Sequence, residues 1–402
     1  MDMTMEKWRV AILNTHPIQY FAPLYAHLHK DPRLDITALY MTNFSLRGGK
    51  DEGFGQAVTW DIDLLAGYRS VFLGKRAKTR VPGGFFSLFV PEVWGAIRSG
   101  RYDALILHGH NNLASLIALV AAKITGVQVF MHGETHLGLT RHGFKKRFRR
   151  PIMSVFYKLC DRFLAIGTAN AAFYRSMNVP AYKIFLAPYC VDNARFFSVA
   201  EASRATRAQT RAKFGIPADM PAILYAAKFS LRKHPEMILE AAKRVRMMTD
   251  KPFSVVMCGA GELDERLKTF CHENNMGNVV FTGFVNQSAL PGLYGACDIF
   301  VLPSEDEPWG LAVNEAMCAG LPIVLSREIG CAADLVEDGT NGFTPDARDI
   351  DGFAQALQKL VQDDELRQAQ GRQSVERISH WGYREFQAGL IAALSGLKRT
   401  VG

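Results

Sequence analysis

The sequence predicts an α/β protein built from two doubly wound domains. Its 402 residues are too many for one ordinary domain, and with 48% hydrophobic residues the chain can form two sizeable cores. Short, continuous apolar runs alternate with amphipathic helical patterns along almost the whole chain, which is typical of parallel sheets covered by helices on both faces. The runs fall into two successive series, so each series is expected to form one sheet.

The expected strands are short runs rich in Val, Ile, Leu and Phe. Ligands of parallel sheets bind at the carboxyl ends of the strands, and with two domains the natural site is a cleft between them. The first series is RVAILN (9–14), ALILH (104–108), QVFMHGE (128–134) and RFLAIG (162–167), and the second is AILYAAK (222–228), SVVMCG (254–259), NVVFTGF (278–284), IFVLPS (299–304) and PIVLS (322–326).

A polar stretch rich in Ala and Arg separates the two series. It begins near residue 192 and leads into a Gly-Ile-Pro sequence. We therefore expect a first domain over 1–195, a linker over 196–210 and a second domain over 211–378.

The net charge of +8 points to an anionic partner. The densest basic run, RHGFKKRFRRP (141–151), mixes basic and aromatic side chains, which suits an anionic membrane surface. A solvated helix face is the alternative. No known reader motif organises the basic residues, which disfavours a nucleic-acid partner. The residues concerned are Lys145, Lys146, Arg147, Arg149 and Arg150, with Phe144 and Phe148.

The sequence also favours a cytoplasmic location. The N-terminus, MDMTMEKWRVAIL, runs straight into an apolar strand and shows no signal-peptide pattern. The longest apolar helical stretch, LASLIALVAAKI, is too short to span a bilayer. The seven cysteines form no C-x-x-C pair, and an odd number without metal-like spacing favours reduced, buried thiols.

Two further signals are weak. CGAGELDERL (258–267) places Gly259 and Gly261 between a strand and a helix, but Asp264 occupies the third position of a dinucleotide-binding fingerprint, so a tight turn is the simpler interpretation. The DID triplet (61–63) lacks supporting carboxylates, and we interpret it as chance and not as a metal site. The chain has no G-x-x-x-x-G-K-[ST] loop, which argues against ordinary NTP hydrolysis.

The most informative stretch is EPWGLAVNEAMCAGLP (307–322), in which seven residues separate Glu307 from Glu315. A buried strand ends just before it, Pro-Trp-Gly forms a turn, and a helical pattern follows until Gly320. Glu307 is therefore expected at the carboxyl end of a strand. Glu315 is expected about one turn inside the next helix.

The start of that helix suits an activated sugar. Unpaired N–H groups at Gly310, Leu311 and Ala312 would bind an anion such as a diphosphate. The carboxylate of Glu315 can accept hydrogen bonds from the two vicinal hydroxyls of a ribose, and that of Glu307 can do the same for a sugar. Together these groups suit a nucleotide-sugar. Helix capping is the alternative role for both acids.

This stretch resembles the E-x7-E motif of retaining, GT-B-fold glycosyltransferases of family 4 (glycosyl transferases group 1). AAKFSLRKHPEMILEA resembles the basic-x4-Lys element of that family, with Lys228 and Lys233 five positions apart. VVFTGFVNQSALPGLYGACDIFVLPS and EDGTNGF resemble its base-binding and closing loops, and FLAIGTANAAFYRSMNVPAYKIFLAPYCVDNARF resembles the end of its first domain. The resemblance covers the C-terminal half almost continuously and the N-terminal half patchily.

The resemblance implies a GT-B fold, in which two Rossmann-like domains face each other. ERISHWGYREFQAGLIAAL resembles its final helix, so a C-terminal helix over 379–402 is expected to cross back to the first domain. It implies transfer of a hexose or N-acetylhexosamine from a UDP- or GDP-sugar to a hydroxyl acceptor, with retention of configuration and without a metal ion. Lys228 and Lys233 would balance the diphosphate charge, with surface solvation as their alternative role. Glu307 would hold the sugar, and Glu315 the ribose.

The resemblance also implies less specific contacts to the base. Gly283, Phe284 and Val285 resemble a loop whose backbone reads the base, and Gly261 falls in a loop that borders the nucleotide.

In the first domain, His132 at a strand end resembles the histidine that hydrogen-bonds the donor sugar. His108 or His110 is the alternative, and Glu134 could assist. The first loop departs from the Gly-Gly pair that is frequent in the family, because NTHPIQYFAPL carries His16 and Gln19 there. That departure puts phosphate contacts from this loop in doubt, and the loop could instead shape an acceptor pocket.

A lipid-linked acceptor is suggested by the aromatic stretch GGFFSLFVPEVW (83–94) together with the basic run, although the aromatics could instead form core. We therefore expect a role in cell-surface polysaccharide or glycolipid synthesis, peripherally at the inner membrane face. A sugar-nucleotide epimerase on the same fold and a non-catalytic partner subunit of a transferase complex are the alternatives.

Overall fold

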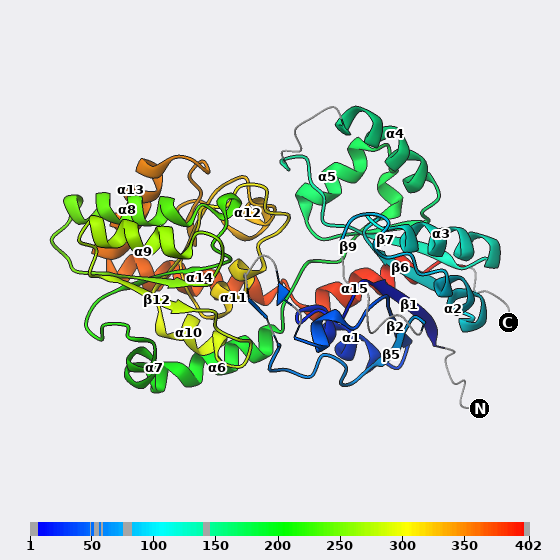
Figure 1. The fold of residues 1–402 in the computed structure, drawn as a ribbon, viewed down its shortest axis with the longest axis horizontal. Helices are drawn as coiled ribbons and strands as arrows, with labels where there is room; N and C mark the ends of the chain where they lie inside the picture. Colours follow the sequence, from blue (N-terminus) through cyan, green and yellow to red (C-terminus); the bar gives the residue numbers. More distant parts are fainter. Residues whose placement is uncertain are drawn as a thin grey trace. The chain divides into compact units, whose positions relative to one another are not determined.

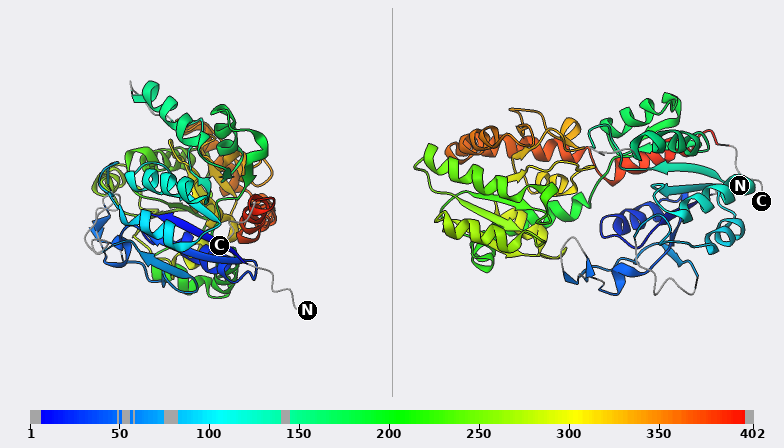
Figure 2. Two further views of the ribbon diagram at one scale, coloured as in Figure 1. Left: turned by 90° about the vertical axis from the view of Figure 1, so that its right-hand side faces the viewer. Right: turned by 45° about the horizontal axis from the view of Figure 1, so that its top comes forward.

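The structure is a computed structural model, and it describes residues 7–48, 50–51, 56–57, 59–74, 83–139 and 145–397. The chain forms two compact units, coloured along the sequence in Figure 1. In each unit, helices cover both faces of a parallel sheet, which Figure 2 shows from two further directions. The first unit comprises Met1–Gly49, Ile62–Tyr189 and Tyr383–Gly402, and the second comprises Lys50–Asp61 and Cys190–Gly382.

The described part of the first unit contains a seven-stranded parallel sheet. Its strand β1 (Trp8–Asn14) pairs with β2 (Leu34–Tyr40) on one side and with β6 (Ala104–His108) on the other. The order is β5-β2-β1-β6-β7-β8-β9, so the direction of strand addition reverses between β1 and β6. The outer strands are β5 (Arg69–Phe72), β7 (Gln128–His132), β8 (Arg162–Ala165) and β9 (Ile184–Leu186).

One helix of the first unit begins and ends at clear local sequence signals. This is helix α3 (Leu113–Thr125): the Asn112 side chain accepts from the Ser115 N–H at its start, and Gly126 ends it at φ 78°. Among the described residues, no helix is long and apolar enough to cross a membrane. The other helices are α1 (Phe21–His29), α2 (Glu92–Gly100), α4 (Lys145–Lys158), α5 (Thr168–Ser176) and α15 (Tyr383–Leu394).

The C-terminal helix α15 belongs to the first unit, although it follows the whole of the second unit in the sequence. It packs on β8, β9 and α1. Gly389 makes this approach possible, because a Cβ there would lie 1.8 Å from the Leu186 carbonyl oxygen. The Gln387 side chain also donates to the Asp31 carboxylate of the first unit.

The second unit contains a six-stranded parallel sheet in the order β12-β11-β10-β13-β14-β15. The central strand β10 (Ala222–Ala226) is buried at all five positions and pairs with β11 (Ser254–Cys258) and β13 (Ile299–Leu302). The remaining strands are β12 (Val279–Gly283), β14 (Ile323–Leu325) and β15 (Gly342–Phe343). Both sheets confirm the two doubly wound domains predicted from the apolar runs.

The segment expected as a linker, 196–210, is helical and packed. It lies in α6 (Asn193–Ala205) and α7 (Arg207–Phe214), which pack on α10 (Leu290–Ala296). The arginines that make the stretch look solvated have partners: the buried Arg211 donates to the Asp298 carboxylate and to three loop carbonyls. The segment 196–210 is therefore a helical, packed connection in spite of its polar composition.

The other helices of the second unit cover the two faces of its sheet (Figure 1). They are α8 (Pro235–Met248), α9 (Asp264–Glu273), α11 (Leu311–Cys318), α12 (Ala332–Leu335), α13 (Ile350–Gln362) and α14 (Asp364–Ser379). All seven cysteines of the chain are free and buried, which confirms the expectation of reduced thiols.

A short segment of the N-terminal half belongs to the second unit. It contains the two-stranded hairpin β3 (Lys50–Asp51) and β4 (Gln56–Ala57). The Thr59 carbonyl accepts from the Asn286 amide at 2.7 Å, and Asp61 accepts from the backbone N–H and the hydroxyl of Ser288. Asp61 of the DID triplet therefore holds the loop that contains Ser288.

Candidate active site

The predicted catalytic residues of the second unit lie where its strand order reverses. Lys228 follows β10 by two positions, and Glu307 follows β13. These two strands are neighbours, and the sheet grows outward from them in opposite directions. In open α/β sheets this reversal leaves a crevice at the carboxyl ends of the strands, where ligands bind.

Lys233 and Glu307 form an ion pair at this edge. The Lys233 ammonium contacts Oε2 of Glu307, and the two side chains are only 12% and 13% exposed. Burial lowers the pKa of Lys233 to about 7, and the nearby Arg232 and Lys228 add to that effect. The Glu307 carboxylate acts in the opposite direction, because an adjacent negative charge favours the protonated amine. Three cationic side chains and one carboxylate therefore meet at one place.

The turn that carries Glu307 is held by tryptophan packing. Trp309 is 2% exposed, its indole N–H donates to Asn314 Oδ1 at 2.9 Å, and its ring stacks on that of Trp381. Gly310 follows with φ 95°, a conformation that disfavours any side chain. The Pro-Trp-Gly turn is therefore fixed by a buried aromatic anchor and by a backbone that needs glycine.

Helix α11 begins directly after Gly310. The Val313 N–H donates to the Gly310 carbonyl, whereas the N–H groups of Leu311 and Ala312 lie in the first turn, where a helix offers them no intrahelical acceptor. The anion site expected at this helix start stays a prediction.

Glu315 lies on the same helix, within reach of two residues that the sequence did not single out. Its Oε2 accepts from the Tyr294 hydroxyl at 2.8 Å. Burial raises the pKa of Glu315 to about 7, while the Tyr294 hydrogen bond and the charge of Arg195 act in the opposite direction. The carboxylate is therefore oriented by Tyr294 and partly desolvated, which suits the recognition of hydroxyl groups.

The glycines of the CGAG loop have a structural cause. A Cβ on Gly259 would lie 2.0 Å from the Ala227 carbonyl oxygen, and one on Gly261 would lie 2.4 Å from that of Phe229. The two loops are also joined by a hydrogen bond from the Phe229 N–H to the Ala260 carbonyl. The glycine loop thus packs backbone to backbone against the loop that carries Lys228, and the predicted nucleotide contact of Gly261 stays a prediction.

The loop expected to read the base follows β12. Gly283 has φ 68°, and the backbone of Val285 hydrogen-bonds the Cys258 thiol. The ring of Phe284 lies 6.0 Å from that of Trp60, which comes from the N-terminal segment of the second unit. Trp60 is therefore a candidate contact for the base that sequence reasoning missed, because it is distant in sequence from every motif.

In the first unit, a hydrogen-bonded chain fixes the tautomer of His132. Asn14 uses its Oδ1 to accept from the Thr15 N–H, so its amide donates to the Tyr25 hydroxyl at 3.2 Å. The Tyr25 proton then goes to His108 Nε2 at 2.9 Å, and burial keeps His108 neutral by holding its pKa well below the usual value. Its single proton therefore lies on Nδ1 and is donated to His132 Nδ1 at 3.2 Å.

His132 consequently carries its own proton on Nε2. That atom is buried and has no hydrogen-bond partner among the described residues, and burial lowers the pKa of His132 to about 3. A buried, unsatisfied donor is costly, so this N–H is available to an acceptor atom of a ligand. The side chain itself is 1% exposed. The contact with the donor sugar therefore stays a prediction.

Glu134 and Tyr189 form a second polar pair near His132. The Tyr189 hydroxyl donates to Glu134 Oε1 at 2.5 Å, and burial raises the pKa of Glu134. The loop after β1, which lacks the Gly-Gly pair, contributes His16, whose Nδ1 lies 2.9 Å from Thr15 Oγ1. These groups line the carboxyl edge of the first sheet, since they follow β1 and β7.

Two family comparisons decide what kind of protein carries these residues. Residues 206–377 match the family described as glycosyl transferases group 1, and residues 60–190 match the glycosyl transferase 4-like domain. The chain is a glycosyltransferase, and its residues 206–377 match the group 1 family. The first match contains Lys228, Lys233, Glu307 and Glu315, so the candidate site lies within the part that defines the family.

Named relatives agree with this assignment. A Methanocaldococcus jannaschii protein named as an uncharacterized glycosyltransferase is 27% identical over 177 residues, which are 44% of this chain but only 40% of that protein. The Escherichia coli UDP-Gal:alpha-D-GlcNAc-diphosphoundecaprenol alpha-1,3-galactosyltransferase is 27% identical over 289 residues, which are 68% of this chain and 70% of that protein.

A solved structure confirms the fold. HepE of Anabaena, in complex with UDP and glucose, superimposes with a TM-score of 0.69 over 96% of this chain and 99% of that chain, at 16% identity. At that identity the likeness shows the fold alone. Together with the two parallel sheets, it establishes the GT-B fold that the motif resemblance implied.

The predicted metal independence is not tested by these comparisons and stays a prediction. Within the described part of the chain, no three His, Cys, Asp or Glu side chains are grouped as a metal site would require.

Proposed function

We propose that this glycosyltransferase moves a hexose or N-acetylhexosamine from a UDP- or GDP-sugar to a hydroxyl acceptor with retention of configuration. The observation that carries the proposal is the contact between Lys233 and Glu307 beside Lys228, at the strand reversal of the family domain. It supplies cations for a diphosphate and a carboxylate for a sugar at one place.

The proposed step needs no metal ion. The bond between the anomeric carbon and the diphosphate oxygen breaks, a bond from that carbon to the acceptor oxygen forms on the same face, and the acceptor's proton passes to the leaving phosphate. Negative charge grows on the diphosphate as that bond breaks. Lys228, Lys233 and the first-turn N–H groups of α11 would stabilise it, because fixed charges help most where charge develops in the transition state.

Glu315 and the Trp60–Phe284 pair would contact different parts of the donor's nucleoside. Glu315, held by Tyr294, would accept from the ribose hydroxyls, and the two rings would border the base. The E. coli relative is named for UDP-Gal, and HepE was solved with UDP, which supports a UDP-sugar ahead of a GDP-sugar.

The test combines donor binding with product analysis. A true donor at saturating excess should raise the free energy of unfolding by roughly 2–4 kcal/mol in a thermal-shift screen of UDP- and GDP-sugars. Proton NMR of the product should then show the anomeric configuration of the donor. Inversion would refute the retaining assignment. Donor consumption without an acceptor product would indicate an epimerase, and donor binding without turnover would indicate a non-catalytic subunit.

We also propose that the acceptor is lipid-linked and is met at an anionic membrane surface, with the protein on the inner, cytoplasmic face. The aromatic side chains of the stretch 83–94 are exposed, with Phe86 at 75% and Phe89 at 56%, whereas Leu88, Val90 and Val93 of the same stretch are buried in the core. On α4, Ile152 and Val155 are 70% and 61% exposed, and the same helix begins with the basic run. Residues 141–144 and the side chains of 145–149 lie outside the described residues. The E. coli relative is named for a diphosphoundecaprenol-linked acceptor.

Vesicle flotation tests this surface. The protein should float with anionic vesicles at low salt, and Phe86→Ser together with Ile152→Ser should weaken the association. Met247→Ser is the matched control, because Met247 is 76% exposed on the second unit. Salt-insensitive association, or equal loss in the control, would rule out the proposed surface.

A further inference from the structure

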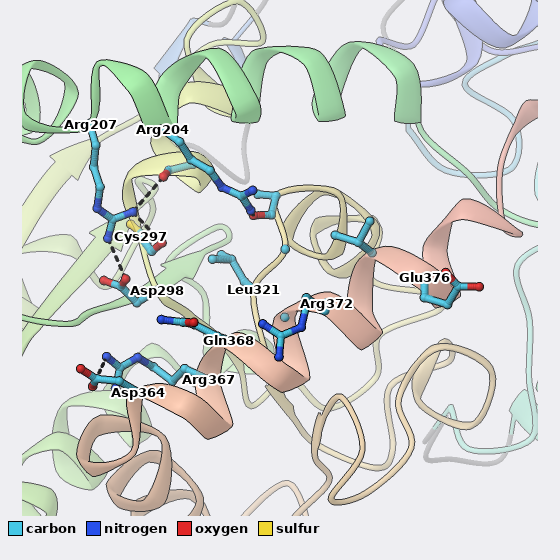
Figure 3. Close-up of a pocket in the computed structure, with 15 residues that line it drawn as sticks. Arg204, Arg207, Cys297, Asp298, Leu321, Asp364, Arg367, Gln368, Arg372 and Glu376 are labelled. Atoms are coloured by element: carbon cyan, nitrogen blue, oxygen red, sulfur yellow. Dashed lines mark hydrogen bonds and ion pairs between the residues drawn. The ribbon is translucent and has the colours of Figure 1, made fainter.

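A second basic pocket lies in the second unit, away from the candidate active site (Figure 3). It has a volume of about 560 Å³ and is lined by α6, α7, α14 and the residues that follow α10 and α11. Asp298, which lines it, directly precedes β13, whereas Glu307 follows that strand. The pocket therefore lies at the amino-terminal edge of the sheet, opposite the edge that carries the lysines.

Four arginines line this pocket, and they differ in how many hydrogen bonds their guanidinium groups make. Arg207 donates to the Asp298 carboxylate and to the Gly295 carbonyl, and Arg367 donates to Asp364 and to the Leu360 carbonyl. These two guanidinium groups therefore have structural partners, and Arg207 also caps the carboxyl end of α10.

The other two arginines, Arg204 and Arg372, have N–H groups without a hydrogen-bond acceptor among the described residues. Arg204 uses one nitrogen, Nη2, to donate to the Ala319 carbonyl at 2.9 Å. Arg372 is exposed and, in the described part of the chain, makes no hydrogen bond or ion pair. Both side chains are drawn at the pocket in Figure 3. A planar guanidinium with unused N–H groups matches the geometry of a phosphate group.

The local charge balance is positive in spite of the acidic lining. Asp298 is shared by Arg207 and Arg211, and Asp364 is shared by Arg367 and Lys251, so each aspartate faces two cations. Glu376 is the third acid of the lining, and Arg204 and Arg372 add two more cations. Within the lining, four arginines therefore face three carboxylates, and Arg211 and Lys251 outside it also pair with Asp298 and Asp364. A hollow with an excess of one sign concentrates ions of the other.

We propose that this pocket binds a small phosphorylated molecule without an aromatic base, such as a sugar phosphate, as a second anion site separate from the donor site. The volume suits a small molecule. Among the described residues, no aromatic side chain lines the pocket, so a nucleobase has nothing to stack on. Gln368 and Glu376 can hydrogen-bond hydroxyl groups beside a phosphate held by Arg204 and Arg372. The proposal does not depend on the proposed transfer reaction.

Isothermal titration calorimetry of the full chain tests the proposal, with ribose 5-phosphate as the probe and unphosphorylated ribose as its control. The phosphate ester should bind, and ribose should not. Arg372→Gln should weaken the binding at least roughly tenfold through loss of a charge-assisted contact. Arg372 decides the test because it has no structural contact to lose, and Arg204→Gln should have a similar effect.

Two controls separate this site from others. Arg327→Gln removes a charge from an exposed arginine of the same unit that does not line the pocket, and it should leave the dissociation constant unchanged. Lys228→Ala impairs the donor site and should also leave it unchanged. Binding that survives Arg372→Gln but is lost in Lys228→Ala, or no binding of the phosphate ester by the unmodified chain, would overturn the proposal.

Discussion

The indole of Trp381 stacks on that of Trp309, with ring centroids 5.6 Å apart and planes 15° from parallel. Trp309 belongs to the turn between Glu307 and α11, and Trp381 follows α14, just before the chain passes into the first unit at Tyr383. Asn193 donates to the carbonyl of Ile378 on the same segment. The turn that carries Glu307 is thus packed against the segment through which the chain leaves the second unit.

We expect Trp381→Ala to loosen this turn. The free energy of unfolding should fall by roughly 1–2 kcal/mol, because an aromatic stack and its buried area are lost. Affinity for UDP-sugar should fall as well, since the turn positions Glu307. Denaturant unfolding and calorimetry measure the two effects. Trp94→Ala, a partly exposed tryptophan of the first unit, should leave donor affinity unchanged; an equal loss there would contradict this explanation.

Glu307→Gln should reduce turnover by roughly a hundredfold, because the charged partner of Lys233 and of the sugar is replaced by a neutral amide. UDP should still bind, because its phosphates and ribose would be held by other residues. Initial rates of sugar transfer and UDP titrations measure this difference. Glu305→Gln is the matched control in the same loop, where Glu305 pairs with Arg348 and His234. If both variants lose activity equally, the loop and not the Glu307 charge is responsible.

Glu315 should make stability depend on pH. Its pKa is about 7 in the folded chain, against an ordinary value of 4.5. The folded state therefore binds more protons between these values, so this contribution is fully present below pH 4.5 and is lost as pH rises through 7. Urea midpoints measured across this range should decline with pH in the unmodified chain. The decline should be smaller in Glu315→Gln, and parallel curves would disprove the assignment.

Gly261→Ala should destabilise the second unit by roughly 1–3 kcal/mol, because the added Cβ would lie 2.4 Å from the Phe229 carbonyl oxygen. The Lys228 loop would have to move, so UDP affinity should fall too. Melting temperature and UDP titration measure both. Gly277→Ala is the control, because a Cβ there meets nothing within 4 Å. Normal stability in Gly261→Ala would show that the two loops do not pack as described.

Tyr25→Phe should change the tautomer population of His132. Without the Tyr25 proton, His108 Nε2 loses its donor, and the proton of His108 is no longer confined to Nδ1. Nitrogen-15 NMR of the imidazole groups distinguishes the two tautomers. The unmodified chain should show His132 protonated at Nε2, and an Nδ1-protonated His132 there would refute the hydrogen-bonded chain. Tyr102→Phe serves as the control, because that tyrosine lies outside the chain of hydrogen bonds.

Most of the fold could be predicted from continuous apolar runs, and the exceptions have causes. The strand β2 was not predicted, because Asp35 and Thr37 interrupt its apolar pattern, although Leu34–Tyr40 is central enough to pair with β1. The composition of α6 and α7 is typical of a linker because their arginines find partners only after folding. In the site, Lys233 and Glu307 were predicted separately, and their contact emerged from the strand order.

The sequence by itself determined the two series of strands, the family motif and the identity of its lysines and glutamates, because each is a pattern within a short stretch of chain. Only the tertiary structure decided which distant residues support them. It brought Thr59 to Asn286 across 227 positions, Trp381 to Trp309, and His108 to His132. Such contacts depend on how whole elements pack, and a local pattern of side chains does not specify which partner a buried polar or aromatic group will meet.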